Sequence, residues 1–118
     1  MANGKLVVRS GVSFKGSGPS MDVTPASAAV LDELAGVLAS HPEIRRVRIE
    51  AHWDTSLPKD KAHDLTEQQA KTVAAYLTRQ GVAAERIQVA GMGADKPIVP
   101  NIGMAKMRNR RVEIRAVN

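Results

Sequence analysis

Four residues of mixed chemistry, His52, Trp53, Asp54 and Thr55, follow a strand-like segment near the middle of the chain. Residues 46–51 alternate charged and apolar side chains, which is typical of a strand. Open α/β sheets usually bind ligands where a strand ends and its loop leaves the sheet. We therefore expect a binding site at this strand end, with Asp54 as its central charge and Trp53 either as a stacking platform or as a plug for the core.

The sequence gives little support for a metal site or a catalytic site. His52, Asp54 and His63 supply groups that suit zinc, but their spacing has no metal-site signature. A hydrogen-bonded core histidine is the better interpretation of His52. The sequence offers no nucleophile with an adjacent base, and Gly91-Met92-Gly93 does not precede a helix as a nucleotide-binding motif requires. We therefore expect no enzyme activity, no metal and no cofactor.

The elements before this segment follow from hydrophobic periodicity. Residues 6–14 alternate in the manner of a strand, with a possible bulge at Gly11, and residues 15–20 form a loop by composition. Thr24-Pro25 is a helix start with Thr24 as the cap, and His41-Pro42 ends that helix. The buried face of this helix is expected to consist of Val30, Leu31, Leu34, Val37 and Leu38.

A second helix should follow the polar loop 55–63. It is expected to start near Leu65, capped by Asp64 or by Thr66, and to end at Gly81. Its expected buried stripe consists of Leu65, Ala70, Val73, Ala74 and Leu77.

The last third of the chain predicts a strand over 87–92, a short helix over 103–108 and a final strand over 112–116. Charged residues alternate with apolar ones in both 46–51 and 111–116, which suggests one solvated face of the sheet. The predicted fold is an α/β (α+β) two-layer sandwich: a mixed sheet of βαβαββ type with the helices packed on one face.

Composition limits the other possibilities. The 118 residues, 43% of them apolar, suit a single domain over residues 1–118. The net charge of +5 suits an acidic partner, but with Trp53 as the only evident stacking aromatic we do not expect nucleic acid. The chain contains no cysteine, and we find no membrane-spanning run and no secretory signal. A domain working outside the cytoplasm would then be excised from a longer protein.

Three motifs carry a family resemblance when they are taken together: residues 51–54 (AHWD), 65–70 (LTEQQA) and 109–113 (NRRVE). Their order and spacing resemble those of the OmpA-like peptidoglycan-binding domain, which has Gly-His-Thr-Asp, Leu-Ser-x-x-Arg-Ala and Asn-Arg-Arg-Val-Glu at these places. The resemblance covers nearly the whole chain. It also includes Phe14, residues 29–34, His41-Pro42, residues 47–50, Val73, Tyr76-Leu77, Gly81-Val82, Arg86, Gly91-Met92-Gly93, Pro97 and Asn101.

The resemblance implies non-catalytic binding of the peptidoglycan stem peptide, whose diaminopimelate is held by a paired Asp and Arg. Asp54 would meet the ammonium of this zwitterion, and a guanidinium fork would bind its carboxylate. The family's Arg falls on Gln69, and a neutral amide there weakens the site roughly tenfold or more. Arg110 or Arg111 is expected to compensate in part.

The remaining expected site residues are Asn109, Thr55, Ser17 and Trp53, with Gln69 and Ser17 as neutral hydrogen-bonding groups. The family's Asn falls on Ala62, and Ala51 and Trp53 replace its Gly and Thr, so the pocket is altered. Two alternatives stay open. Asp54 either binds the ligand or has a structural role only, capping a turn or pairing with Arg111, and the arginines either bind ligand or lie on a solvated face.

The resemblance further implies a periplasmic location, in a parent protein anchored to the cell envelope, with the outer membrane preferred. Peptidoglycan is the expected partner, and contact with a membrane is expected only through segments outside this chain. The alternative is a degenerate domain that has lost wall binding and acts as a scaffold for an envelope protein partner.

Overall fold

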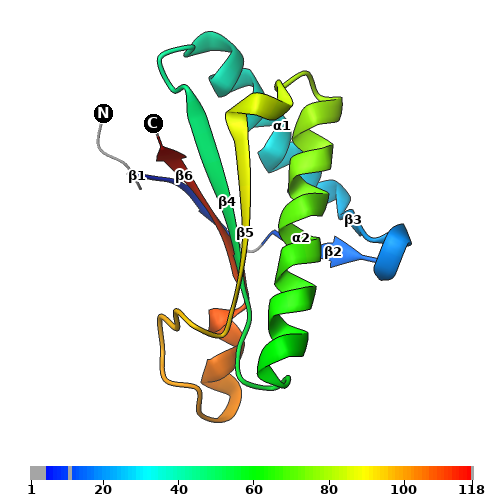
Figure 1. The fold of residues 1–118 in the computed structure, drawn as a ribbon, viewed down its shortest axis with the longest axis vertical. Helices are drawn as coiled ribbons and strands as arrows, with labels where there is room; N and C mark the ends of the chain where they lie inside the picture. Colours follow the sequence, from blue (N-terminus) through cyan, green and yellow to red (C-terminus); the bar gives the residue numbers. More distant parts are fainter. Residues whose placement is uncertain (1–4, 11, 118) are drawn as a thin grey trace.

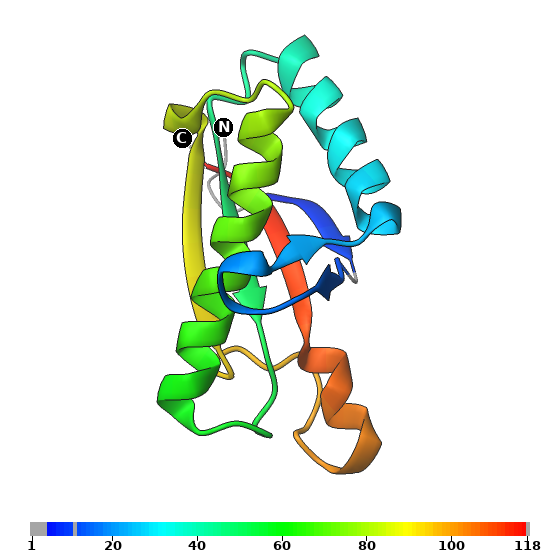
Figure 2. The same ribbon diagram turned by 90° about the vertical axis from the view of Figure 1, so that its right-hand side faces the viewer.

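The computed structural model describes residues 5–10 and 12–117, and helices cover one face of its larger sheet (Figures 1 and 2). The elements in chain order are β1 (Lys5–Ser10), β2 (Phe14–Lys15), η1 (Gly18–Ser20), β3 (Asp22–Val23), α1 (Pro25–Ser40), β4 (Arg46–His52), α2 (Lys59–Arg79), η2 (Ala84–Arg86), β5 (Ile87–Gly93), η3 (Gly103–Asn109) and β6 (Arg111–Val117). The four-stranded sheet has the order β1-β6-β4-β5, while β2 and β3 form a small separate sheet. Strands β4 and β5 are parallel, and β6 is antiparallel to β1 and β4. The predicted two-layer fold of βαβαββ type is confirmed.

The core lies between the sheet and the helices. Alternate residues of β4 and β6 face the helices and are at most 1% exposed: Val47, Ile49, Ala51, Val112, Ile114 and Ala116. From the helices, Leu31, Leu34, Leu38, Val73 and Leu77 pack against them. The period of two in the strands therefore places every second side chain of β4 and β6 on the opposite face.

Helix α1 starts at Pro25, as predicted, but its cap and its buried face differ from expectation. The Thr24 hydroxyl bonds to the hydroxyls of Ser13 (2.7 Å) and Ser27 (3.2 Å) instead of a backbone N–H. Val30 and Val37 are 39% and 43% exposed, so their predicted burial is wrong. The buried residues are Ser27, Leu31, Leu34, Ala35 and Leu38. Their spacings of three and four form one narrow stripe, from which positions 30 and 37 are rotated by about 100°.

Helix α2 starts at Lys59, six residues or about 1.7 turns before the predicted start at Leu65. Neither Asp64 nor Thr66 is a cap, because both lie inside the helix. The Thr66 hydroxyl donates to the carbonyl of Ala62 (2.8 Å) and accepts from the N–H of Gly93 (3.0 Å). Gly81, with φ +100°, ends the helical segment as expected. Among the described residues, no helix is long and apolar enough to cross a membrane.

Glycines at the end of β5 let α2 approach the sheet closely. A Cβ on Gly91 would lie 2.4 Å from the backbone nitrogen of Glu67, which is closer than real Cβ contacts. Gly93 has φ +56°, and its carbonyl accepts from the N–H of Trp53 at 2.8 Å. These contacts fix the end of β5 beside the loop that leaves β4.

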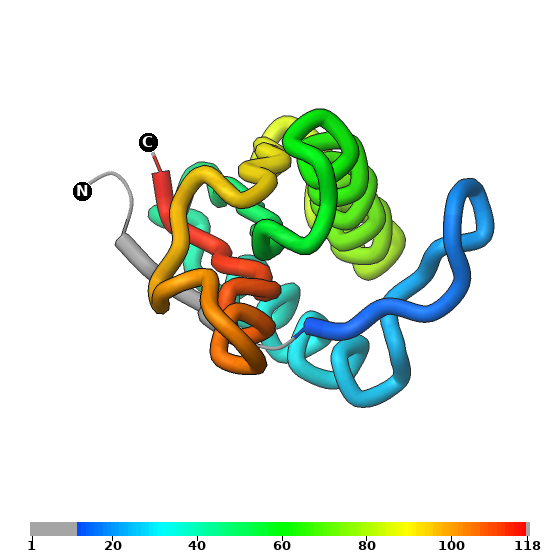
Figure 3. Tube along the Cα trace, turned by 90° about the horizontal axis from the view of Figure 1, so that it is seen from below, coloured from blue at the N-terminus to red at the C-terminus, as the bar shows by residue number. Residues whose placement is uncertain are grey.

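The predicted N-terminal strand over residues 6–14 is wrong in its extent. Strand β1 ends at Ser10 and pairs with β6, whereas Phe14 belongs to β2. Between them the chain is tied to α1, because the backbone N–H of Ser13 donates to the hydroxyl of Ser27 (2.8 Å). The β2–β3 hairpin projects beyond the helices (Figures 1 and 3). A possible bulge at Gly11 lies outside the described residues, but the β1 register shifts between Leu6 and Val8.

The sheet face opposite the helices is charged, and several of its charged side chains are buried. Glu50 is 7% exposed, Glu113 1% and Arg111 8%. The prediction of a solvated face is therefore wrong for these three side chains, whereas Arg48 is 39% exposed. Each carboxylate is paired with guanidinium groups, which offsets the cost of removing both charges from water.

Candidate functional site

Asp54 lies two residues beyond the end of β4 and is fully buried. Its Oδ2 accepts a hydrogen bond from Arg110 Nε at 2.7 Å, and its Oδ1 accepts from the backbone N–H of Ser56 at 2.9 Å. Asp54 therefore both caps a turn and forms an ion pair. Its partner is Arg110, not Arg111 as the sequence alternative had it.

Arg110 is held over the ring of Trp53. Its guanidinium carbon lies 4.4 Å from the ring centroid, a cation–π distance. Trp53 Nε1 donates to the hydroxyl of Ser56 at 3.2 Å, and Arg110 Nη2 reaches the same hydroxyl at 3.4 Å. The Arg110 side chain is still 32% exposed. Asp54, Trp53 and Ser56 thus hold the Arg110 guanidinium at the surface, and part of this side chain stays open to solvent.

The charge state of Asp54 follows from two opposed effects. Burial raises the pKa of the carboxyl group, but hydrogen bonds from Ser56 and the charge of Arg110 outweigh burial, so the pKa is lowered. Asp54 is therefore ionised at neutral pH. The pair carries one negative and one positive charge side by side.

A cavity of about 240 Å³ adjoins this pair. Its lining residues come from the segment before β2, the end of β4, α2 and the start of β6: Val12, Ser13, Phe14, His52, Trp53, Gln69, Arg110, Arg111 and Val112. Gln69 is 8% exposed, and its amide forms no hydrogen bond with another described residue. The cavity thus combines a guanidinium edge, an unused amide and an aromatic ring, groups that bind a small polar molecule with a carboxylate.

The structure brings Asp54, Trp53, Gln69 and Arg110 together, as the sequence predicted. Thr55 is exposed beside Asp54. Ser17 lies in the β2–β3 hairpin, where its carbonyl accepts from the hydroxyl of Ser20 at 2.8 Å, and it does not line the cavity.

Asn109 is fully buried, and its side-chain amide forms hydrogen bonds within the chain. Its Oδ1 accepts from the N–H groups of Ile98 (2.8 Å) and Val99 (3.1 Å). Its Nδ2 donates to the Val99 carbonyl (3.0 Å) and to Asn101 Oδ1 (2.9 Å). These bonds use the full capacity of a side-chain amide, so Asn109 anchors the loop between β5 and η3.

The guanidinium of Arg111 also forms hydrogen bonds within the chain. It donates from Nε to Glu113 (2.7 Å), from Nη1 to the Asn109 carbonyl (3.1 Å) and from Nη2 to the Lys96 carbonyl (2.9 Å). Of the two adjacent arginines, Arg110 therefore faces the surface at Asp54 and Arg111 braces the loop on the other face.

Sequence reasoning missed Ser56, which contacts Asp54, Trp53 and Arg110. A signal existed, because a serine two residues after an Asp is typical of a turn closed by the carboxylate. His52 is buried as expected, but neither ring nitrogen has a hydrogen-bond partner among the described residues, so the predicted hydrogen bond is wrong. Burial, and then the charge of Arg111, lower the pKa of His52 to about 4.

The metal ligands considered from the sequence do not form one cluster. Asp54 pairs with Arg110, and His63 lies 3.0 Å from a carboxylate oxygen of Asp95. Within the described part of the chain, the group with metal-ligand spacing is instead Glu50, His52 and Glu113, whose ligand atoms lie within 4.8 Å of one another.

The fold is that of one family of domains. The sequence model described as the OmpA family matches residues 17–111, and the chain belongs to this family. It is 38% identical over 104 residues to the probable lipoprotein YiaD of Escherichia coli, covering 87% of this chain and 46% of that protein. It is 37% identical over 106 residues to the peptidoglycan-binding protein ArfA of Mycobacterium tuberculosis, covering 87% of this chain and 31% of that protein. The chain thus spans about half or less of these curated relatives.

Solved structures agree with the fold. The peptidoglycan-associated lipoprotein from Burkholderia pseudomallei matches with a TM-score of 0.74 at 24% identity, covering 87% of this chain and 86% of that one. A putative MotB-like protein from Desulfovibrio vulgaris matches with a TM-score of 0.70 at 22% identity, covering 84% and 67%. At these identities the similarity establishes the architecture.

Proposed function

We propose that this domain binds the peptidoglycan stem peptide without catalysis, at the site formed by Asp54 and Arg110. The observation that carries the proposal is the 2.7 Å pair of these residues beside a cavity lined by Gln69 and Trp53. Membership of the OmpA family and the name of the relative ArfA support it. The ligand group is a diamino acid end such as that of diaminopimelate, which carries an ammonium and a carboxylate on one carbon.

Binding requires an exchange of partners. Asp54 has no exposed surface, so a ligand ammonium reaches its carboxylate only after the Arg110 side chain turns away. Arg110 is partly exposed and keeps its stacking surface on Trp53, so it can turn toward the ligand carboxylate without unfolding a strand. The ligand zwitterion then replaces one internal ion pair with two external ones.

The affinity should be modest. Gln69 offers a neutral amide where a cation would strengthen the grip on the carboxylate, a difference of roughly tenfold or more. Thr55, exposed next to Asp54, is the candidate for a further hydroxyl contact. Ser17, Asn109 and Arg111 have weaker support, because the first lies outside the cavity lining and the other two are used in internal hydrogen bonds.

The setting that we propose is the periplasm, with this domain as one part of a longer envelope protein that is anchored in the outer membrane and held to the cell wall. The relatives support this setting, since they include an outer-membrane lipoprotein YfiB and an outer membrane porin F. The peptidoglycan layer is then the partner, and the anchor lies in another part of the protein.

A second function is favoured by the enclosure of Asp54 and the neutrality of Gln69. Both features suit a domain that has lost the wall ligand and serves as a protein-interaction module in the envelope. The two functions predict different effects of Gln69→Arg. A large gain of muropeptide binding from none supports loss of the ligand, whereas a modest gain over measurable binding supports a weakened site.

The direct test is an NMR titration of the ¹⁵N-labelled domain with a diaminopimelate-containing muropeptide. We expect shifts of the Asp54, Ser56 and Arg110 resonances and of the Trp53 indole N–H at millimolar ligand. Asp54→Asn, which keeps the shape and removes the charge, should abolish them. The absence of any shift at these groups in the wild-type domain would refute the proposal.

A further inference from the structure

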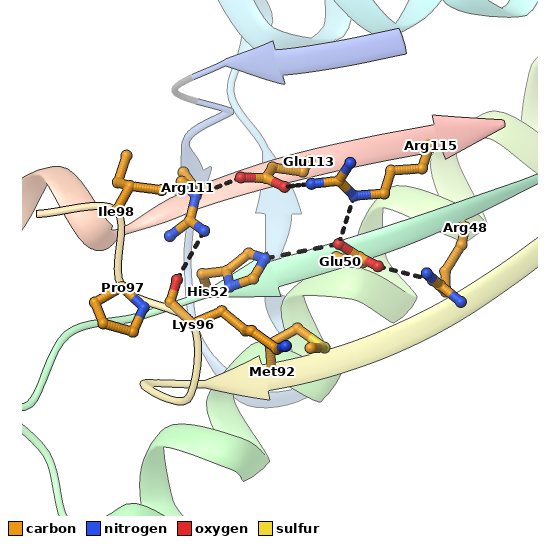
Figure 4. Close-up of a pocket in the computed structure, with 10 residues that line it drawn as sticks. All are labelled: Arg48, Glu50, His52, Met92, Lys96, Pro97, Ile98, Arg111, Glu113 and Arg115. Carbon is orange, nitrogen blue, oxygen red and sulfur yellow. Dashed lines mark hydrogen bonds and ion pairs between the residues drawn. The ribbon is translucent and has the colours of Figure 1, made fainter. Parts of the chain in front are cut away.

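The face of the sheet opposite the helices carries a second cleft, of about 520 Å³, that the stem-peptide site does not use. Its charged lining consists of Arg48, Glu50, Lys96, Arg111, Glu113 and Arg115, with His52 on its floor (Figure 4). Met92, Pro97 and Ile98 form an apolar wall on one side. The loop after β5 therefore closes part of the charged sheet face into a concave site.

The charges of this cleft are unequal. Glu50 accepts from Arg48 Nε (2.8 Å) and from Arg115 Nε (3.0 Å). Glu113 accepts from Arg111 Nε (2.7 Å) and also pairs with Arg115. With Lys96, four cations line the cleft against two carboxylates, which leaves a formal excess of two positive charges.

Several donors remain available after these pairs are counted. The terminal nitrogens of Arg48 form no hydrogen bond with another described residue, and the side chain is 39% exposed. The ammonium of Lys96 is exposed and makes no ion pair with a described residue. Donors from a strand and from the covering loop thus line the same cleft.

His52 gives independent evidence that the cleft is a binding site. Its ring is 3% exposed, and both nitrogens lack a hydrogen-bond partner among the described residues. The dashed contact to Glu50 in Figure 4 is 3.9 Å, too long for a hydrogen bond. A buried polar group without a partner is unfavourable, so this imidazole stands ready to pair with a group bound in the cleft.

The charge balance decides which kind of ligand fits. Glu50, His52 and Glu113 have the spacing of a metal site, but every carboxylate oxygen of the two glutamates is already bonded to a guanidinium. A divalent cation would add charge to a cleft that is already positive. An oxyanion would instead neutralise the excess and accept bonds from the free donors.

We propose that this cleft binds a small organic oxyanion, a phosphate or a carboxylate with a short apolar part. The anionic group would lie between Arg48 and Lys96 above His52, and the apolar part would contact Met92, Pro97 and Ile98. The proposal does not rest on stem-peptide binding, because Asp54 and Arg110 do not line this cleft, although His52 and Arg111 line both cavities.

The test uses inorganic phosphate and butyrate as probes, titrated into the ¹⁵N-labelled domain at constant ionic strength set with sodium chloride. We expect shifts of the His52 ring nitrogens and of the Met92 and Lys96 amides, and the probe that binds more tightly identifies the anionic group. No shift at His52 with either probe would overturn the proposal.

Two variants and a matched control separate a site from general charge attraction. Arg48→Gln and Lys96→Gln should each weaken binding about tenfold, the effect of losing one charge-assisted bond. Arg46→Gln removes the same charge from the preceding exposed position of β4, outside the cleft lining, and should leave binding within about twofold. Equal weakening by Arg46→Gln would refute the site, as would Zn²⁺ binding at His52 in place of either anion.

Discussion

The imidazole of His52 is expected to make the stability of the domain fall on mild acidification. Its pKa is about 4 in the folded chain against 6.5 for an ordinary histidine, with burial as the main cause. Arg111 and Arg115 lower it further, while Glu113 and Glu50 oppose them. Because the unfolded chain binds the proton first, stability is fully present above about pH 6.5 and is lost as the pH falls toward about 4.

The size of this effect follows from the two pKa values. Linkage gives a loss of about 2 kcal/mol between about pH 7.5 and about pH 5, approaching about 3 kcal/mol at lower pH. The lowered pKa values of Asp54 and Glu113 place their protonation below this window. Urea unfolding monitored by circular dichroism across this range measures the loss.

The control is His52→Gln, which keeps a polar side chain of similar size but cannot titrate. The variant should show a much smaller loss over the same window, whatever its stability at neutral pH. If the wild type and the variant lose stability in parallel, or if the wild type loses none, the account of His52 as a buried neutral histidine is wrong.

Three further predictions concern stability, each measured by urea unfolding. Asn109→Ala should cost about 2–4 kcal/mol, because it removes four hydrogen bonds that anchor the loop before η3; a cost below about 1 kcal/mol would contradict that role. Gly91→Ala should destabilise by about 1–3 kcal/mol through its clash with Glu67, whereas Gly36→Ala, in open space on α1, should be neutral or stabilise. Arg110→Gln should cost about 1–2 kcal/mol, less than a fully buried pair, since Arg110 is partly exposed; an unchanged midpoint would mean that the pair is unimportant for folding.

The sequence predicted the fold well where a single local pattern dominates. The alternation in β4 and β6, the Pro25 start of α1 and the left-handed Gly81 all act within a few residues, and each was confirmed. The start of α2 was missed because Asp64 and Thr66 look like caps. The Thr66 hydroxyl is instead used by Gly93, 27 residues away, and no local pattern contains that contact.

The charged sheet face was the larger error, and its cause is also long-range. Glu50 and Arg115 are 65 residues apart, yet they pair across β4 and β6. Alternating charge in one strand is equally compatible with solvent and with a neighbouring strand of opposite charge. The antiparallel register of β4 and β6 places the charged residues of the two strands side by side, and this register does not follow from either strand's own sequence.

The candidate site was predictable only in part: Ser56 was missed, Ser17 lies outside the cavity lining, and the arrangement did not follow from the sequence. Asp54, Gln69 and Arg110 were identified, and the structure places them at one strand end. Which arginine faces Asp54 depends on how the chain turns from η3 into β6. The four bonds of Asn109 fix that turn, and none of them is evident from residue types alone.

The central claim, that the Asp54–Arg110 site binds the cell wall, is tested most directly by co-sedimentation with purified insoluble sacculi that contain diaminopimelate. We predict that the wild-type domain sediments with the sacculi and that Asp54→Asn stays in the supernatant. Arg46→Gln, which removes a cation away from the site, should sediment like the wild type. If the wild-type domain remains in the supernatant, or if Asp54→Asn sediments equally well, the claim is contradicted.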